Sequence, residues 1–140
     1  MINIRKARTI IKGTLAKGHE MELNPLTVAV LDAGGHLIAM EREDGASPGR
    51  FEIARGKAYG CIMLGLPGSA LNARAEAQGY FMAAMNGAFD GKVVPVQGGV
   101  LVKDKRGAIV GAVGVTGDTS ENDAAAALAG IEKAGLIGVS

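Results

Sequence analysis

Three evenly spaced glycines, Gly111, Gly114 and Gly117, constrain the fold of this chain more than any other feature. They lie in the segment IVGAVGVTG, whose β-branched residues predict a strand although glycine weakens strands. Because side chains alternate along a strand, Gly111 leaves a notch on one face and Gly114 leaves one on the other. Such a notch permits the close approach of a helix, a second chain or a flat ligand, and helix packing is the simplest of the three interpretations.

The same glycines suggest two kinds of nucleotide site, and the sequence excludes both. A dinucleotide fingerprint needs G-x-G-x-x-G at a strand-to-helix turn of a parallel βαβ unit. The spacing here is G-x-x-G-x-x-G, and two of the glycines lie inside the strand. A P-loop needs a Gly-Lys-Ser/Thr ending, which the chain lacks.

Hydrophobic periodicity and turn residues divide the chain into helices and strands. The predicted elements are a helix over 2–18, strands over 26–32 and 37–44, helices over 50–64 and 70–85, strands over 93–104 and 108–116, and a helix over 121–134. Ser120 and Asp123 resemble a capping box at the start of the last helix. Short hairpin connections join both strand pairs, so we expect a mainly antiparallel sheet in an α+β domain, with helices on one or both faces.

Composition limits the classes of function. The chain has 140 residues, of which 48% are hydrophobic and 21% charged, which suits one globular domain over 1–140 and disfavours disorder. The net charge is +1 and tryptophan is absent, so neither the basic field nor the aromatic platform of a nucleic-acid-binding protein is present.

Cys61 is the single cysteine, so an intramolecular disulfide and a cysteine-rich zinc site within one chain are both excluded. Its position on the apolar face of the predicted 50–64 helix favours a buried, inert thiol over a nucleophile. No apolar run approaches the length of a membrane span, and the first residues do not form a secretory signal. We therefore expect a cytoplasmic protein without a membrane partner.

Four segments, in this order along the chain, resemble the GlcG/HbpS-like family. They are VAVLDAGGHLIAMEREDGA (28–46), ARGKA (54–58), GGVLVKDKRGAIVGAVGVTG (98–117) and END (121–123). This family is also called the haem-degrading or DUF336 domain family, and its domain forms the C-terminal part of some corrinoid adenosyltransferases. The resemblance implies a single five-stranded antiparallel sheet with flanking helices, in a profilin- or PAS-like three-layer architecture. It also implies homo-oligomers, and haem binding in some members, without a required cofactor.

The resemblance makes His19 the candidate axial ligand of a haem iron, because some relatives are thought to use a histidine from the N-terminal region. A neutral imidazole is a suitable iron ligand. The alternative is a surface histidine near the end of a helix. His36 follows the hairpin glycines, where an exposed turn residue is the simpler interpretation.

Two basic residues are candidate contacts for an anionic ligand. Arg42 ends the second strand at REDG, and its guanidinium can hold a carboxylate in a bidentate manner or form an ion pair within the hairpin. Lys57 is the basic residue of ARGKA that matches the family. It can meet an acidic substrate or a haem carboxylate, or lie on a solvated helix face.

The turn formed by Thr116, Gly117 and Asp118 ends a strand and precedes a helix, where free amides and the helix dipole favour an anion. The simpler interpretation is that the side chains of Asp118, Ser120 and Asp123 satisfy those amides themselves.

These features predict an oligomeric small-ligand-binding protein, with haem or another anionic planar molecule as the ligand. The alternative is an enzyme acting on a small organic acid, such as an isomerase, hydratase or hydrolase of a catabolic operon. It would need a proton-transfer group, Asp32, Glu121 or a histidine, beside Arg42. No motif decides between them. An accessory protein that acts through protein contacts is a third hypothesis.

Overall fold

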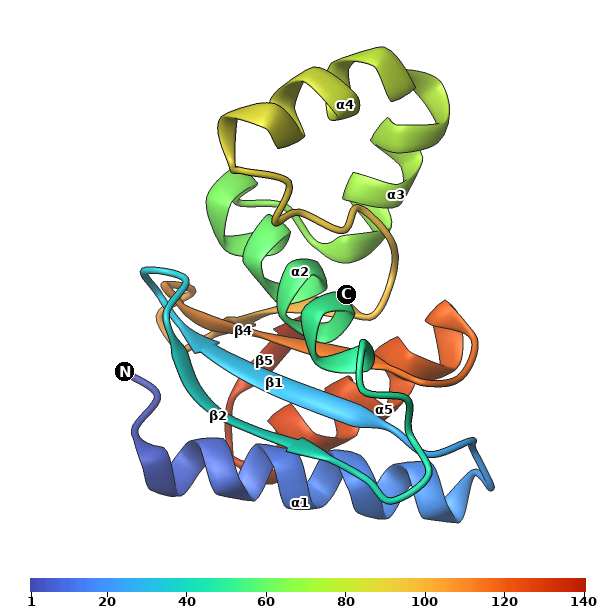
Figure 1. Cartoon of the computed structure of the whole chain (residues 1–140). Coiled ribbons are helices and arrows are strands. Elements are labelled where there is room, and N and C mark those ends of the chain that lie inside the picture. The colour runs from blue at the N-terminus through green and yellow to red at the C-terminus, as the bar shows by residue number, and fades with distance from the viewer.

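The computed structural model describes residues 1–140 and contains one five-stranded sheet with helices on both faces (Figure 1). The strands are β1 (Thr27–Asp32), β2 (Leu37–Arg42), β3 (Gly99–Lys103), β4 (Ile109–Thr116) and β5 (Ile137–Val139). The helices are α1 (Ile4–Glu20), α2 (Arg50–Leu64), α3 (Gly68–Ala77), α4 (Gly79–Ala88) and α5 (Ser120–Lys133). The strand order is β2-β1-β4-β3-β5 and every pair is antiparallel, as the family resemblance implied.

The helices divide into two layers. α1 and α5 pack together on one face of the sheet, and α2 lies on the other, with α3 and α4 projecting beyond it (Figure 1). None of the helices is both long and apolar enough to cross a membrane.

The glycine notches in β4 are filled by packing within the protein. A side chain at Gly114 would overlap the carbonyl oxygen of Ala54 in α2, so the helix lies directly on the strand backbone. On the opposite face, a side chain at Gly111 would collide with Ile2 and with the carbonyl oxygen of Leu31. Helix packing is therefore the correct interpretation for Gly114.

The single helix predicted over 70–85 is wrong, because the chain forms two helices there. Gln78 lies between α3 and α4 with φ −138° and ψ 58°, which no α-helix accommodates. Gly79 follows it and weakens helical continuity. The second helix extends to Ala88, beyond the predicted end at residue 85.

The strand predicted over 93–104 is too long, since pairing begins only at Gly99. Val93 and Val94 leave the sheet and pack against α2, where Gly56 and Gly60 make room for them. The short strand β5 was not predicted. It pairs with β3 over three residues, which gives too little periodicity for a sequence pattern.

Smaller differences affect the ends of elements. α1 runs over Ile4–Glu20 rather than 2–18, and β2 ends at Arg42 rather than residue 44. The capping box is also wrong: Thr119, not Ser120, is the N-cap of α5, and its hydroxyl accepts a hydrogen bond from the amide of Asn122 at 3.2 Å.

Candidate functional site

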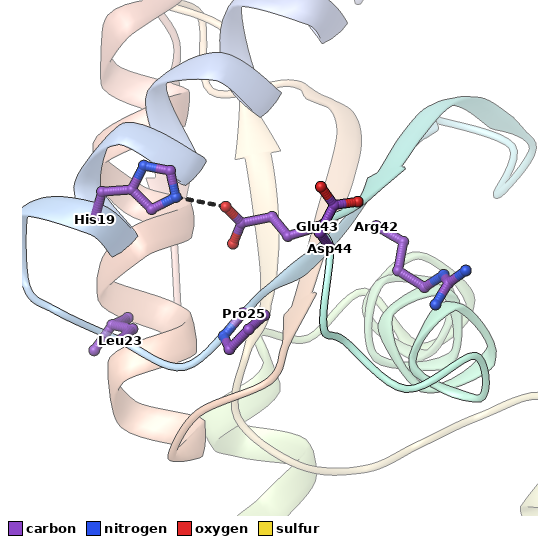
Figure 2. Close-up of a pocket in the computed structure, with 6 residues that line it drawn as sticks. All are labelled: His19, Leu23, Pro25, Arg42, Glu43 and Asp44. Carbon is purple, nitrogen blue, oxygen red and sulfur yellow. Dashed lines mark hydrogen bonds and ion pairs between the residues drawn. The ribbon is translucent and has the colours of Figure 1, made fainter.

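A polar hollow of about 450 Å³ lies where the end of α1 meets the end of the β1–β2 hairpin (Figure 2). Its lining residues are His19, Leu23, Pro25, Arg42, Glu43 and Asp44. The hollow brings together two residues predicted from the sequence, His19 and Arg42.

Local folding positions the histidine. His19 lies in the last turn of α1, after which the chain reverses and the amide of Leu23 donates to the carbonyl of Gly18. The chain then enters β1, and the amide of Glu43 donates to the carbonyl of Leu26. This bond brings the residue after β2 back beside the end of α1.

His19 and Glu43 form the central contact of the hollow. Nε2 of His19 lies 2.6 Å from Oε2 of Glu43, as Figure 2 shows. The second carboxylate oxygen of Glu43 accepts a hydrogen bond from the amide of Leu26 at 2.7 Å. The side chain of His19 is 72% exposed and that of Glu43 only 16%, so an anchored carboxylate orients an accessible imidazole.

Arg42 points away from this pair. Its guanidinium extends toward α2 (Figure 2) and donates a hydrogen bond of 2.7 Å to the carbonyl of Ala46. No carboxylate of the hairpin pairs with it, so the ion pair considered from the sequence is not formed.

Lys57 lies inside the protein, outside the hollow. Its side chain is 3% exposed, and its ammonium group donates to Asp123 at 3.1 Å and to the carbonyl of Val115 at 2.9 Å. The solvated helix face considered from the sequence is therefore wrong. Burial lowers the pKa of Lys57 and raises that of Asp123, and the charge of each partner opposes the shift of the other.

The turn after β4 is satisfied by its own side chains. Asp118 accepts hydrogen bonds from the side chain of Asn122 and from the amides of Asn24 and Thr119. These bonds, led by the one from Asn122, lower the pKa of Asp118. The amide of Asp118 in turn donates to Asp123 at 3.0 Å. The simpler sequence interpretation holds for Asp118 and Asp123, whereas the capping role belongs to Thr119.

Thr116 and Gly117 occupy the end of β4. The hydroxyl of Thr116 accepts a hydrogen bond of 2.9 Å from the guanidinium of Arg50. Gly117 has φ +146° and lies against the backbone of Pro25, so a side chain there would be strained and would collide.

His36 lies at the opposite end of the hairpin, beside a second hollow of about 370 Å³. Its side chain is 82% exposed, in a turn where Asp32 accepts hydrogen bonds from the amides of Gly34 and His36. The bond from the His36 amide is the main cause that lowers the pKa of Asp32. Asp32 is thus a turn-forming residue, and it lies at the other end of β1 from Arg42.

Cys61 is fully buried, and burial raises the pKa of its thiol to about 12. No cluster of three or more histidine, cysteine, aspartate or glutamate side chains is arranged to hold a bare metal ion.

Three residues at or near the site were missed or misjudged from the sequence. Glu43 was not identified as a site residue, yet it anchors His19. Arg50 and Thr27 were not considered, although Arg50 follows a glycine at a predicted helix start. Arg50 joins α2 to β4 through Thr116, and Thr27 of β1 lies opposite Thr116 in the sheet. No local pattern reports such distant pairings.

The fold and the hollow define an α+β domain whose accessible histidine lies at an open polar surface. The chain belongs to the family described as "Haem degrading protein HbpS-like", whose model matches residues 2–132. The resemblance found in the sequence is therefore confirmed. A search of curated protein sequences finds no significant match.

Solved structures share the fold. A haem complex of PduOC is 20% identical, with a TM-score of 0.82 and 94% of both chains covered. The protein ORFY of Klebsiella pneumoniae, assigned to DUF336, is 22% identical, with a TM-score of 0.84, 96% of this chain covered and 90% of that one. A double Glu-to-Asp variant of HbpS from Streptomyces reticuli is 25% identical, with a TM-score of 0.78, 94% of this chain covered and 85% of that one.

Proposed function

We propose that this protein binds haem, or a similar anionic planar molecule, at His19, and does so as a homo-oligomer. The observation that carries the proposal is the pairing of an exposed imidazole with an anchored carboxylate. The family and the haem complex of PduOC support haem as the ligand class. A cytoplasmic location and a single domain over 1–140 stay predictions from the sequence.

The geometry of His19 fits an iron ligand. When Nε2 donates its hydrogen to Glu43, the other ring nitrogen, Nδ1, keeps its lone pair and has no partner within the protein. Carboxylate partners of this kind orient ligating histidines and raise their basicity. Bound haem would supply iron chemistry, while His19 would hold the iron and Glu43 would orient the imidazole.

The surroundings of His19 fit the carboxylates of haem better than its broad apolar faces. Another hollow, of about 530 Å³, adjoins His19 on the side of α1. Besides His19 it is lined by Arg8, Lys12, Leu15, Ala16 and Glu41. Its two cations suit the propionates. Apolar cover is limited to Leu23, Leu15 and Ala16 across the two hollows. Because this apolar cover is small, the proposal includes a second copy of the chain that would cover the remaining face of the haem.

Other residues predicted from the sequence take supporting roles. Arg42 stays at the rim as a further cation. Lys57 and the turn from Thr116 to Asp118 are held within the protein, so we assign them to fixing β4 and α5 behind the site.

A haemin titration tests the proposal. We expect wild-type protein to shift the Soret band at micromolar haemin, and His19→Ala to lose that shift. Glu43→Gln keeps the side-chain size and should weaken binding by about 10–100-fold, the usual effect of losing such a partner. His36→Ala is the matched control, since His36 is also exposed and also lies beside a carboxylate.

Two results would contradict the proposal: no Soret shift in the wild type, or loss of the shift in His36→Ala alone. Light scattering with and without haemin tests the oligomer. A monomer in both conditions would remove the second-copy part of the proposal.

An enzyme acting on a small organic acid is the second candidate. The contact that favours it is again His19 with Glu43, because this pair can exchange a proton in a hollow that Arg42 also lines. Turnover of carboxylic acids that is lost in both Glu43→Gln and His19→Ala would support this candidate.

A further inference from the structure

A second polar cluster lies beneath the first turn of α2, apart from His19. Its most unusual member is Thr27, which is completely buried and whose hydroxyl has no hydrogen-bond partner. Buried polar groups are nearly always paired, so an unpaired hydroxyl indicates a missing partner.

The strand register shows where this hydroxyl lies. Thr27 of β1 is directly opposite Arg42 on one side and Thr116 on the other. Directly opposite residues share a face of the sheet, and here it is the face that contacts α2, since Gly114 packs against Ala54. The hydroxyl of Thr27 therefore lies between a guanidinium-bearing residue and a second hydroxyl.

The beginning of α2 faces the same place. Its first residue, Arg50, is half-buried and donates to the hydroxyl of Thr116 at 2.9 Å. α2 has 15 residues, and its N-cap, Gly49, provides no side-chain cap. The free amides and the dipole of the helix thus add positive potential to that of Arg50.

The local charge balance is positive. Arg50 begins α2 and Lys57 lies two turns further along it, while the carboxylates nearby are already paired, Glu52 of the first turn with Arg55 and Asp123 with Lys57. The nearby charge of Arg50 is one of the causes that lower the pKa of Lys57. The guanidinium of Arg50 has no carboxylate partner, as it donates to a neutral oxygen.

We propose that this cluster binds a small oxyanion, either a carboxylate or a phosphate group. Arg50 supplies charge, the hydroxyls of Thr27 and Thr116 donate hydrogen bonds, and the free amides of α2 complete the site. This site goes beyond haem binding at His19.

Thermal unfolding at constant ionic strength tests the site, with sodium acetate and sodium phosphate as probes and sodium chloride as the reference. A ligand that binds only the folded state raises the Tm in a saturable way. We expect such a rise with acetate, phosphate or both, and none with chloride. A response to acetate alone identifies a carboxylate site, and one to phosphate alone identifies a phosphate site.

Two valine variants separate a binding role from a packing role. Thr27→Val removes an unpaired buried hydroxyl, so it should raise the Tm without ligand and shift the oxyanion response to about tenfold higher concentration or more. Thr14→Val is the control, because Thr14 has the other unpaired buried hydroxyl but lies where α1 meets α5, beside Gly130. It should raise the Tm equally and keep the wild-type response.

Arginine variants give a second, independent test. Arg50→Met should abolish the response, whereas Arg55→Met, a change to an arginine of the same helix that pairs with Glu52, should preserve it. If Thr27→Val does not fold, the two arginine variants decide whether the cluster binds an oxyanion. The proposal is overturned if chloride gives the same rise as the oxyanions, if neither oxyanion acts, or if Arg50→Met responds like the wild type. Haemin binding by Arg50→Met and the oxyanion response of His19→Ala keep the two sites distinguishable.

Discussion

The two faces of the sheet are stabilised in different ways. Toward α1 and α5 lies a core of 15 buried residues made almost entirely of isoleucine, leucine, valine and alanine. Toward α2 the core has seven buried residues, and close backbone contact at Gly114 and the ion pair of Lys57 with Asp123 accompany it. The first face is stabilised by apolar area, whereas the second depends on close backbone fit and contains a buried ion pair.

This difference explains where the second polar cluster, formed by Arg50, Thr27 and Thr116, lies. An aliphatic core gains about 1.5–3 kcal/mol for each large side chain buried and tolerates small changes of shape. A buried ion pair roughly breaks even against desolvation, so it adds little stability but fixes which elements meet. The charged and hydroxyl groups that could meet an anion, Arg50, Thr27 and Thr116, all belong to the α2 face.

The largest expected loss of stability comes from a substitution that disrupts the close contact between α2 and the sheet. Gly114→Ala places a side chain on the carbonyl oxygen of Ala54 and should lower the free energy of unfolding by about 4 kcal/mol or more. Urea unfolding measures it. Gly87→Ala in α4 is the control, since nothing lies within 4 Å of the added atom and alanine favours a helix. Equal stability of the two variants would show that α2 does not rest on the strand.

The next effect separates ion pairing from apolar burial. Lys57→Met leaves the carboxylate of Asp123 buried without its cation and should cost about 3 kcal/mol or more. Combining it with Asp123→Leu should recover much of that loss, because no buried charge then remains. A double-mutant cycle by urea unfolding measures the coupling. Additive losses in the double variant would show that the pair is not a unit.

The smallest effect at neutral pH concerns Cys61. With its pKa raised to about 12, the thiol should not react with a thiol reagent at pH 8 until the protein unfolds. Because the thiol ionises more readily in the unfolded chain, the free energy of unfolding is unaffected by it below the ordinary pKa of 9.0. It falls as pH rises from there toward 12. The loss is at most about 1.4 kcal/mol per pH unit, and Cys61→Ala should lack this component. Rapid labelling of the native protein would contradict the burial of this face.

Several elements were predictable from the sequence because their causes are local. The β1–β2 hairpin follows from two β-rich runs around AGGH, and the extended state of the Ile109–Thr116 segment follows from its β-branched residues. The break at Gln78 and the departure of Val93 from the sheet were missed. Both depend on how α3 and α4 continue from α2 and on which residues fill the notches of α2.

The site divides in the same way. His19 and Arg42 were identified from the sequence, and both line the hollow. The partners that define their chemistry, Glu43 and the carbonyl of Ala46, were not identified. Lys57 matched the family pattern, yet its location in the interior was not predictable from helical spacing alone.

The sequence by itself determined the family, the alternation of strands and helices, and the positions where side chains are missing from β4, because periodicity and glycine content act within a few neighbouring residues. Only the tertiary structure decided that α2 fills one of those positions, that Lys57 faces Asp123 66 residues away, and that the hydroxyl of Thr27 is left without a partner. Those outcomes depend on how strands from distant parts of the chain pair side by side, and a pairing between residues far apart in the chain leaves no local pattern at either of them.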